Sequence, residues 1–179
     1  MPDAQRTAAL VVQVRHAFAD VAYPGDDRLT DSFGDEPDAL ARDFLGRDDW
    51  TALDADFLNQ APEGWGSALS FFSGEALRFY LPAYLVADLE GALLIGDPTT
   101  RLCAFVTPSM EGKRVAKFYG GGTLGEHARR QFALFDTAQV AVIVAYLWWK
   151  LDEVDYDPTV EQALENYWLP READFGRPG

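Results

Sequence analysis

Residues 135–151 read FDTAQVAVIVAYLWWKL, and this stretch decides the fold. Asp136 is a favourable N-cap, and Gln139 completes a capping box, in which each of the two side chains accepts a hydrogen bond from a backbone N–H of the first turn. The ten residues from Val140 to Trp149 carry no charge, so the helix is apolar on nearly every side and is expected at the centre of the fold. It is too short to cross a bilayer, which needs about 20 such residues.

Helical spacing of apolar residues continues on both sides of this stretch. Ser73 is the expected N-cap of a long helix, in which Pro82 indicates either a kink or a junction between two helices. Pro170 is expected to end the last helix, and Tyr23–Asp26 has the Pro-Gly centre of a type II turn. The helices predicted by this spacing are Ala8–Asp20, Pro37–Leu45, Trp50–Leu58, Gly74–Leu89, Leu124–Leu134 and Pro158–Trp168.

Residues 91–122 have a different pattern of apolar and turn-forming residues. The short apolar runs Leu93–Ile95, Leu102–Val106 and Val115–Tyr119 are separated by turn-forming residues, a pattern that suits strands or loops. We therefore predict a mainly α fold, a helical bundle around residues 136–151 with a small β or irregular insertion near residues 91–122; an α+β fold is the alternative. Residues 1–172 are expected to form a single globular domain, and residues 173–179 a loose C-terminal tail.

Composition and charge exclude several classes of protein. A chain of 179 residues with 48% hydrophobic residues is long enough to bury a core, and its single cysteine, Cys103, allows no disulfide within the chain. The net charge of −14 repels phosphate backbones, so binding to nucleic acid or to an anionic membrane is disfavoured. Without a leader-like N-terminus or a membrane-length apolar stretch, we expect a cytoplasmic protein.

The acidic residues concentrate in two parts of the chain. Asp20–Asp56 holds twelve acids against three bases, and Asp152–Gly179 holds eight against two, giving charges of −9 and −6. Such a field favours a basic protein partner and faster association with it. The candidate contact residues are Asp26, Asp27, Asp31, Asp35, Asp152, Glu153 and Asp155. Asp26–Asp38 breaks the alternate-acid pattern of a calcium loop, so no metal site is predicted there.

Residues 120–125 read GGGTLG and match the GxGxxG pattern of dinucleotide sites. The match lies two-thirds along the chain with no second βαβ unit after it, so we predict no bound cofactor. Nucleophilic catalysis needs a base near a nucleophile, and the spacing of His16, His127 and Cys103 does not imply that they meet. No catalytic residue is therefore assigned. A small hydrolase or nucleotide-binding enzyme using the Gly120–Gly125 loop, with Lys117 or His127, is the alternative function.

Several short motifs occur together in this chain. They are Tyr23-Pro24-Gly25-Asp26, then Leu81-Pro82-Ala83-Tyr84-Leu85, then Phe135-x-x-x-Gln139. Their order resembles that of an uncharacterised bacterial domain-of-unknown-function family with YPGD, LPAYL and F-x-x-x-Q signatures, over roughly Val14–Leu151. The resemblance implies a shared fold and assigns no activity or catalytic residue.

Absence of a catalytic constellation, together with two acidic segments, predicts a small protein-binding or structural module. Binding of a basic toxin by an immunity-like partner is one version of this function, by analogy of composition alone. The sequence leaves the identity of the partner and the oligomeric state open.

Overall fold

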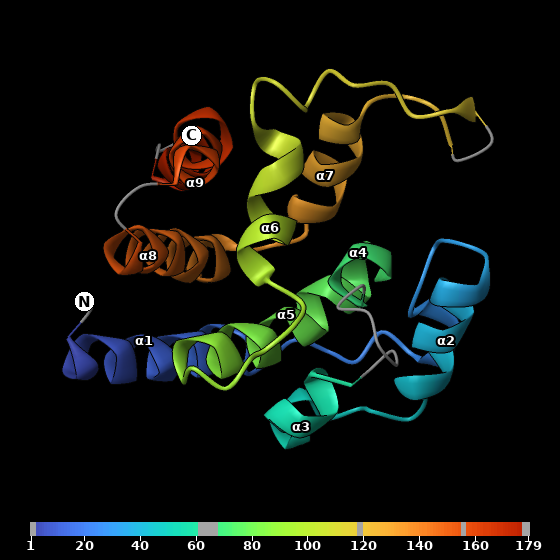
Figure 1. Cartoon of the computed structure of the whole chain (residues 1–179), viewed down its shortest axis with the longest axis horizontal. Helices are drawn as coiled ribbons and strands as arrows, with labels where there is room; N and C mark the ends of the chain where they lie inside the picture. The colour runs from blue at the N-terminus through green and yellow to red at the C-terminus, as the bar shows by residue number, and fades with distance from the viewer. Residues whose placement is uncertain (1–2, 61–67, 118–119, 155–156, 177–179) are drawn as a thin grey trace. The chain divides into compact units, whose positions relative to one another are not determined.

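The computed structural model describes residues 3–60, 68–117, 120–154 and 157–176 and is mainly α-helical (Figure 1). The chain divides into two compact units: unit 1 comprises residues 1–17 and 99–179, and unit 2 comprises residues 18–98. β structure in the described ranges is limited to isolated bridges, Thr30 with Phe72 and Arg114 with Thr123. The prediction of a mainly α fold is confirmed, whereas a single domain over residues 1–172 stays a prediction.

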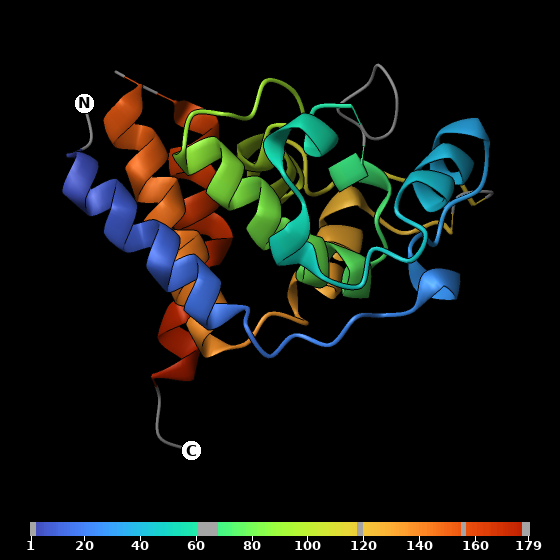
Figure 2. The ribbon, with the colours of Figure 1, turned by 90° about the horizontal axis from the view of Figure 1, so that it is seen from below.

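Unit 1 is built on two long helices, α1 (Ala4–Ala17) and α8 (Thr137–Glu153), which lie side by side (Figure 2). The predicted capping box is present at the start of α8, where Asp136 accepts from the Gln139 N–H and Gln139 accepts from the Asp136 N–H. The Gln139 side chain also donates to the Ala17 carbonyl, at 3.2 Å. One buried glutamine therefore joins the end of α1 to the start of α8.

The two adjacent tryptophans of α8 have opposite environments. Trp149 is buried, and its indole N–H donates to the Thr7 hydroxyl of α1 at 2.9 Å. Trp148 is 44% exposed. Successive residues of a helix point about 100° apart, so only one of the pair faces α1. The buried apolar residues of α8 are Val140, Val142, Ile143, Val144, Tyr146, Leu147 and Trp149.

The other helices of unit 1 surround an aromatic cluster of Phe132, Phe135, Tyr167 and Trp168, in which the rings of Phe132 and Trp168 are 4.9 Å apart. The Trp168 N–H donates to the Leu102 carbonyl at 3.0 Å, so no polar atom of this indole is buried without a partner. These helices are α6 (Pro98–Cys103), the 3-10 turn Ala104–Val106, α7 (Leu124–Phe132), α9 (Pro158–Ala163), the π-helix Leu164–Trp168 and α10 (Leu169–Phe175).

Pro170 does not end the last helix, which corrects our prediction. The π-helix Leu164–Trp168 leads directly into α10, and the Leu169 N–H donates to the Leu164 carbonyl, five residues back. Pro170 lies in the first turn of α10, directly after the π-helix, and the helical conformation continues through it. The chain is thus helical as far as Phe175, which lies within the segment expected to be a loose tail; residues 177–179 lie outside the described part.

Leu102–Val106 is helical rather than a strand or loop. It forms the end of α6 and the following 3-10 turn, and Leu102, Cys103 and Val106 are buried. A five-residue apolar run does not distinguish a strand from a buried helix segment by its periodicity. The remaining described parts of residues 91–122 are largely irregular, as predicted.

Unit 2 is organised around α5 (Gly74–Leu89), whose bounds match the prediction. Ser73 is its N-cap: its hydroxyl accepts from the Ala76 N–H and donates to the Arg28 carbonyl. The helix runs through Pro82 without ending. The shorter elements of unit 2 are the 3-10 turns Asp26–Arg28 and Trp50–Ala52, and the helices α2 (Asp35–Asp43), α3 (Ala55–Leu58) and α4 (Ala68–Phe71).

The core of unit 2 is largely aromatic. Phe44 from the end of α2 makes edge-to-face contacts with Phe72 and Tyr80, with ring centroids 5.0 and 4.9 Å apart. Phe72 and Tyr80 stack on each other at 5.0 Å. Such pairs add about 0.5–1.5 kcal/mol beyond the area that they bury. Tyr84, on the next turn of α5, lies against Phe72 and is 1% exposed.

Candidate functional site

The predicted contact residue Asp26 belongs to a turn that joins two parts of unit 2. Its carboxylate accepts from the Gly46 N–H at 2.7 Å and from the Tyr23 hydroxyl. These hydrogen bonds lower the pKa of Asp26, while partial burial and the bond to Asp26 raise the pKa of Tyr23 to about 12. Gly25 has φ 99° and ψ 151°, whereas the central glycine of a type II turn has ψ near 0°, so the turn is of another kind. Asp26 thus has a structural task in this turn.

Three other predicted contact residues, Asp27, Asp31 and Asp35, are exposed. Between them lies Phe33, which is 59% exposed. The only basic residue within residues 26–38 is Arg28, and it forms an ion pair with Glu75 at 3.0 Å. We call the set Asp27, Asp31, Phe33 and Asp35 the acidic surface: these exposed residues belong to one segment, residues 26–38, which holds six acidic residues.

The C-terminal acidic residues differ from those of unit 2 because their charge is partly neutralised. Asp152 forms an ion pair with Arg6 of α1, and Glu153 lies 3.6 Å from the Lys150 ammonium. Asp155 lies outside the described residues. Of the predicted contact residues, those of unit 2 therefore offer the larger uncompensated charge.

The Gly120–Gly125 loop turns the chain back between residues 113–117 and α7. Gly120, Gly121 and Gly122 all have positive φ, between 66° and 98°, a conformation that side-chain-bearing residues rarely adopt. Val115 N–H donates to Gly122 O, and Leu124 N–H donates to Lys113 O, both at 2.9 Å. The glycines thus build a tight, hairpin-like loop.

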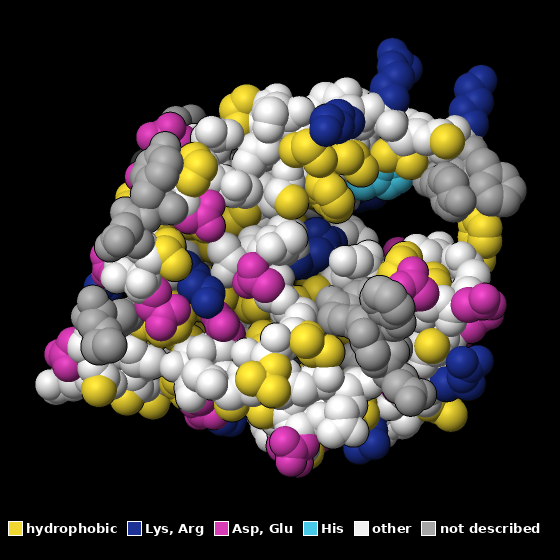
Figure 3. Space-filling model, in the orientation of Figure 1, with side chains coloured by type: hydrophobic (Ala, Val, Ile, Leu, Met, Phe, Trp, Pro, Cys, Tyr) yellow, Lys and Arg dark blue, Asp and Glu magenta, His cyan; other side chains and the backbone are white. Residues whose placement is uncertain are grey.

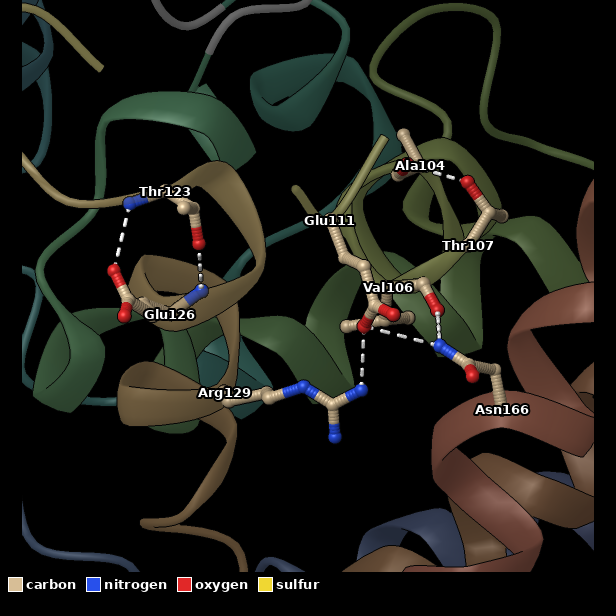
Figure 4. Close-up of polar contacts among 8 residues, drawn as sticks. All are labelled: Ala104, Val106, Thr107, Glu111, Thr123, Glu126, Arg129 and Asn166. Carbon is tan, nitrogen blue, oxygen red and sulfur yellow. Dashed lines mark hydrogen bonds and ion pairs between the residues drawn. The ribbon is translucent and has the colours of Figure 1, made fainter. Parts of the chain in front are cut away.

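Most backbone donors of this loop are used within the protein. The N–H groups of Gly120, Gly121 and Gly125 donate to carbonyls of residues 117, 116 and 111, and the Thr123 N–H donates to the Glu126 carboxylate at 2.8 Å (Figure 4). The Glu126 carboxylate therefore sits at the N-terminus of α7, where a phosphate would lie in a dinucleotide site. His127 Nε2 contacts the Gly121 carbonyl at 2.7 Å. In this conformation the GxGxxG match does not present a phosphate cradle.

Glu111 connects this loop to neighbouring helices through hydrogen bonds of its side chain and backbone. Its carboxylate accepts from Arg129 of α7 at 2.7 Å and from Asn166 of the π-helix at 3.1 Å (Figure 4). The Arg129 hydrogen bond is the main reason why the pKa of Glu111 is lowered. Asn166 also donates to the Val106 carbonyl at 2.7 Å, and the Arg129 guanidinium lies over the Tyr167 ring at 4.9 Å. This cluster joins three segments distant in the sequence.

Other residues considered for catalysis or metal binding are spread over several elements. Cys103 is buried at the end of α6, whereas His16 is exposed on α1. Among the residues described, no group of three or more His, Cys, Asp or Glu is arranged to hold a metal ion.

Sequence reasoning missed Phe33 and Glu111. A signal for Phe33 was present, because it is the single aromatic residue in a polar, acidic segment. Glu111 had no such signal, since its partners lie 18 and 55 residues away.

Comparison with known families places the chain in a class defined by its sequence. The chain belongs to a family of unknown function (DUF6714), whose model matches residues 6–172. No curated protein and no solved structure matches the chain. In the described part of the chain, no helix has the length and apolar character of a membrane span. This match confirms the predicted membership of a domain-of-unknown-function family and assigns no activity.

Proposed function

We propose that this chain is a cytoplasmic protein-binding module that docks a basic partner on the acidic surface of unit 2. The observation that carries the proposal is the exposure of Phe33 between Asp31 and Asp35. A large exposed apolar side chain rimmed by polar groups is typical of an interaction site, and aromatic anchors supply much of the binding energy of interfaces.

The charges around Phe33 suit a partner that carries lysine or arginine around an apolar patch. Carboxylates at the rim of an interface act mainly on the rate of association and on the choice of partner, whereas a buried aromatic anchor slows dissociation. An immunity-like protein that covers the basic face of a toxin is one version of this function. It rests on the composition of the chain and on the acidic surface together.

A role of the Gly120–Gly125 loop in nucleotide binding or hydrolysis is the weaker alternative. Its backbone donors at Gly120, Gly121 and Gly125 are bound to carbonyls of the chain. A nucleotide would have to displace these hydrogen bonds and the Glu126 carboxylate, so the geometry favours the binding function.

The proposal is tested with a defined basic probe, a twelve-residue peptide of alternating lysine and leucine, whose binding is followed by surface plasmon resonance. The variant D31N/D35N is expected to lower the association rate and its dependence on salt. F33A is expected to raise the dissociation rate about tenfold, because burying a phenylalanine contributes about 1.5–3 kcal/mol.

The matched control is D56N/E90Q, which removes two exposed carboxylates of unit 2 outside the acidic surface. It should bind the probe nearly as the unmodified chain does. If this control weakens binding as much as D31N/D35N, or if F33A leaves the dissociation rate unchanged, the proposed surface is wrong. Asp26 is left intact in every variant because its carboxylate holds the turn at Gly46.

A further inference from the structure

The basic residues of this acidic chain are unevenly placed. Residues 111–130 hold five basic side chains and two acidic ones, a charge of +3, so the rest of the chain carries −17. Three of the five, Lys113, Arg114 and Lys117, lie within five residues and are exposed. We call residues 113–117 the basic arm; Figure 1 draws it in yellow, and in Figure 3 long dark-blue side chains project from the molecular surface.

The basic arm is held in place by its backbone. The bridge between Arg114 and Thr123 is flanked by hydrogen bonds from Val115 to Gly122 and from Leu124 to Lys113, both 2.9 Å long. Its base is joined to the unit through the hydrogen bonds of Glu111 with Arg129 and Asn166. The three charges are therefore presented from a fixed backbone, so less conformational entropy is lost on binding than from a disordered segment.

The charges of the arm also lack local compensation. Four other basic side chains have acidic partners, in the pairs Arg6–Asp152, Arg28–Glu75, Arg129–Glu111 and Lys150–Glu153. Lys113, Arg114 and Lys117 form no ion pair with any residue that the structure describes. Three neighbouring uncompensated cations in a chain of net charge −14 are suited to an anionic partner.

We propose that the basic arm of unit 1 is a second interaction surface, which binds an acidic polypeptide segment. The charge of the whole chain favours this class of anion over nucleic acid. A nucleic acid backbone is long and would extend over the acidic remainder of the chain, which repels it. A short run of carboxylates can instead be accommodated near the arm, within the screening length of about 8 Å at physiological salt. This inference is independent of the function proposed for unit 2.

The test uses a fluorescein-labelled peptide of eight glutamates at physiological salt, with binding followed by fluorescence anisotropy. The variant R114Q/K117Q should weaken binding about three- to tenfold, because an exposed ion pair contributes about 0.2–1 kcal/mol. The control R15Q/R42Q also removes two exposed, basic side chains, one near the end of α1 and one near the end of α2, and should leave binding unchanged. Circular dichroism checks that both variants stay folded.

Four results would overturn the proposal. One is absence of binding to the unmodified chain, and another is equal weakening by R114Q/K117Q and R15Q/R42Q. The third is that a twelve-residue oligothymidylate binds the arm more tightly than the peptide at the same salt, which would assign the arm to nucleic acid. Self-association that is lost in R114Q/K117Q, without peptide binding, would assign it to a second copy of this chain. The variants D31N/D35N keep peptide binding if the two surfaces act independently.

Discussion

Gln139 and Asp26 show how single polar residues join segments within each unit. Gln139 is buried, caps the start of α8 and donates to the last carbonyl of α1. Asp26 closes a turn of unit 2 through Tyr23 and Gly46. Both belong to the motifs that carry the family resemblance, YPGD and F-x-x-x-Q. In this chain, the residues of these motifs are therefore explained by hydrogen bonds within the fold.

The first prediction concerns two buried tyrosines of α5. The Tyr80 hydroxyl donates to the Arg47 carbonyl at 2.7 Å, whereas the buried Tyr84 hydroxyl has no hydrogen-bond partner among the described residues. An unsatisfied buried hydroxyl costs about 1–3 kcal/mol, and a typical hydrogen bond contributes about 0.5–1.5 kcal/mol. Y84F should therefore leave the free energy of unfolding unchanged or raise it, and Y80F should lower it by about 1 kcal/mol.

Urea denaturation of both variants checks this prediction. Each change removes one oxygen atom from the same helix, so either variant is the control for the other. Equal destabilisation by Y84F and Y80F would show that the Tyr84 hydroxyl has a partner after all.

The second prediction concerns how the stabilisation by the Glu111 carboxylate, which accepts hydrogen bonds from Arg129 and Asn166, depends on pH. The pKa of Glu111 is lowered in the folded chain, first by the hydrogen bond from Arg129. A carboxyl with a lowered folded pKa contributes stability above its unfolded pKa of about 4.3, and this contribution is lost as the pH falls through the folded pKa. E111Q should therefore be less stable than the unmodified chain at pH 7, by a modest amount because Glu111 is partly exposed.

Thermal unfolding followed from pH 7 to pH 3 measures this effect. The difference in stability between E111Q and the unmodified chain should shrink as the pH falls below about 4.3. A difference that stays constant, or that grows toward low pH, would contradict the role of the Glu111 carboxylate.

Among the elements, the sequence predicted best the helices whose start signals are local. Ser73 and Asp136 cap α5 and α8 as expected, because a cap and the backbone N–H that donates to it lie within one turn. The predicted secondary structure was wrong at positions where contacts with distant parts of the chain determine the conformation. The run Leu102–Val106 is helical and receives a hydrogen bond from Trp168, 66 residues later, and the helix after Leu164 continues through Pro170.

The candidate site was only partly predictable for the same reason. Exposed acids such as Asp31 and Asp35 follow from composition, since charged residues in a polar segment stay at the surface. The structural role of Asp26 depends on Gly46, 20 residues away, and no local pattern indicates it. The GxGxxG match is a local pattern, but whether the loop can bind a phosphate depends on Glu111 and Glu126. Oxygen atoms of these two residues accept hydrogen bonds from backbone N–H groups of the loop.

The third prediction concerns the packing of α7 against the segment at Glu111. A Cβ atom added to Gly125 would lie 2.8 Å from the Glu111 carbonyl oxygen and 2.9 Å from its Cα, so the backbone would have to move. G125A should lower the free energy of unfolding by about 1–3 kcal/mol, as overpacking does. The control G112A meets nothing within 4 Å and should be nearly neutral. Urea denaturation measures the free energy of unfolding of both variants. Equal stability of the two would contradict the close packing at Gly125.

At the scale of the whole molecule, charge is the main guide to function. Unit 2 carries the acidic surface around Phe33, and unit 1 carries the basic arm. The family matched by the chain adds no activity to this description. Charged surfaces of opposite sign on the two units support the proposal that the chain binds two different partners.

The most direct test of the central claim is an NMR titration of the 15N-labelled chain with the alternating lysine–leucine peptide. Binding at the acidic surface should concentrate the amide shifts in residues 26–38, with Phe33 among the largest, and F33A should abolish most of them. Shifts that spread evenly over all acidic segments, or that concentrate at Gly120–Gly125 instead, would contradict it.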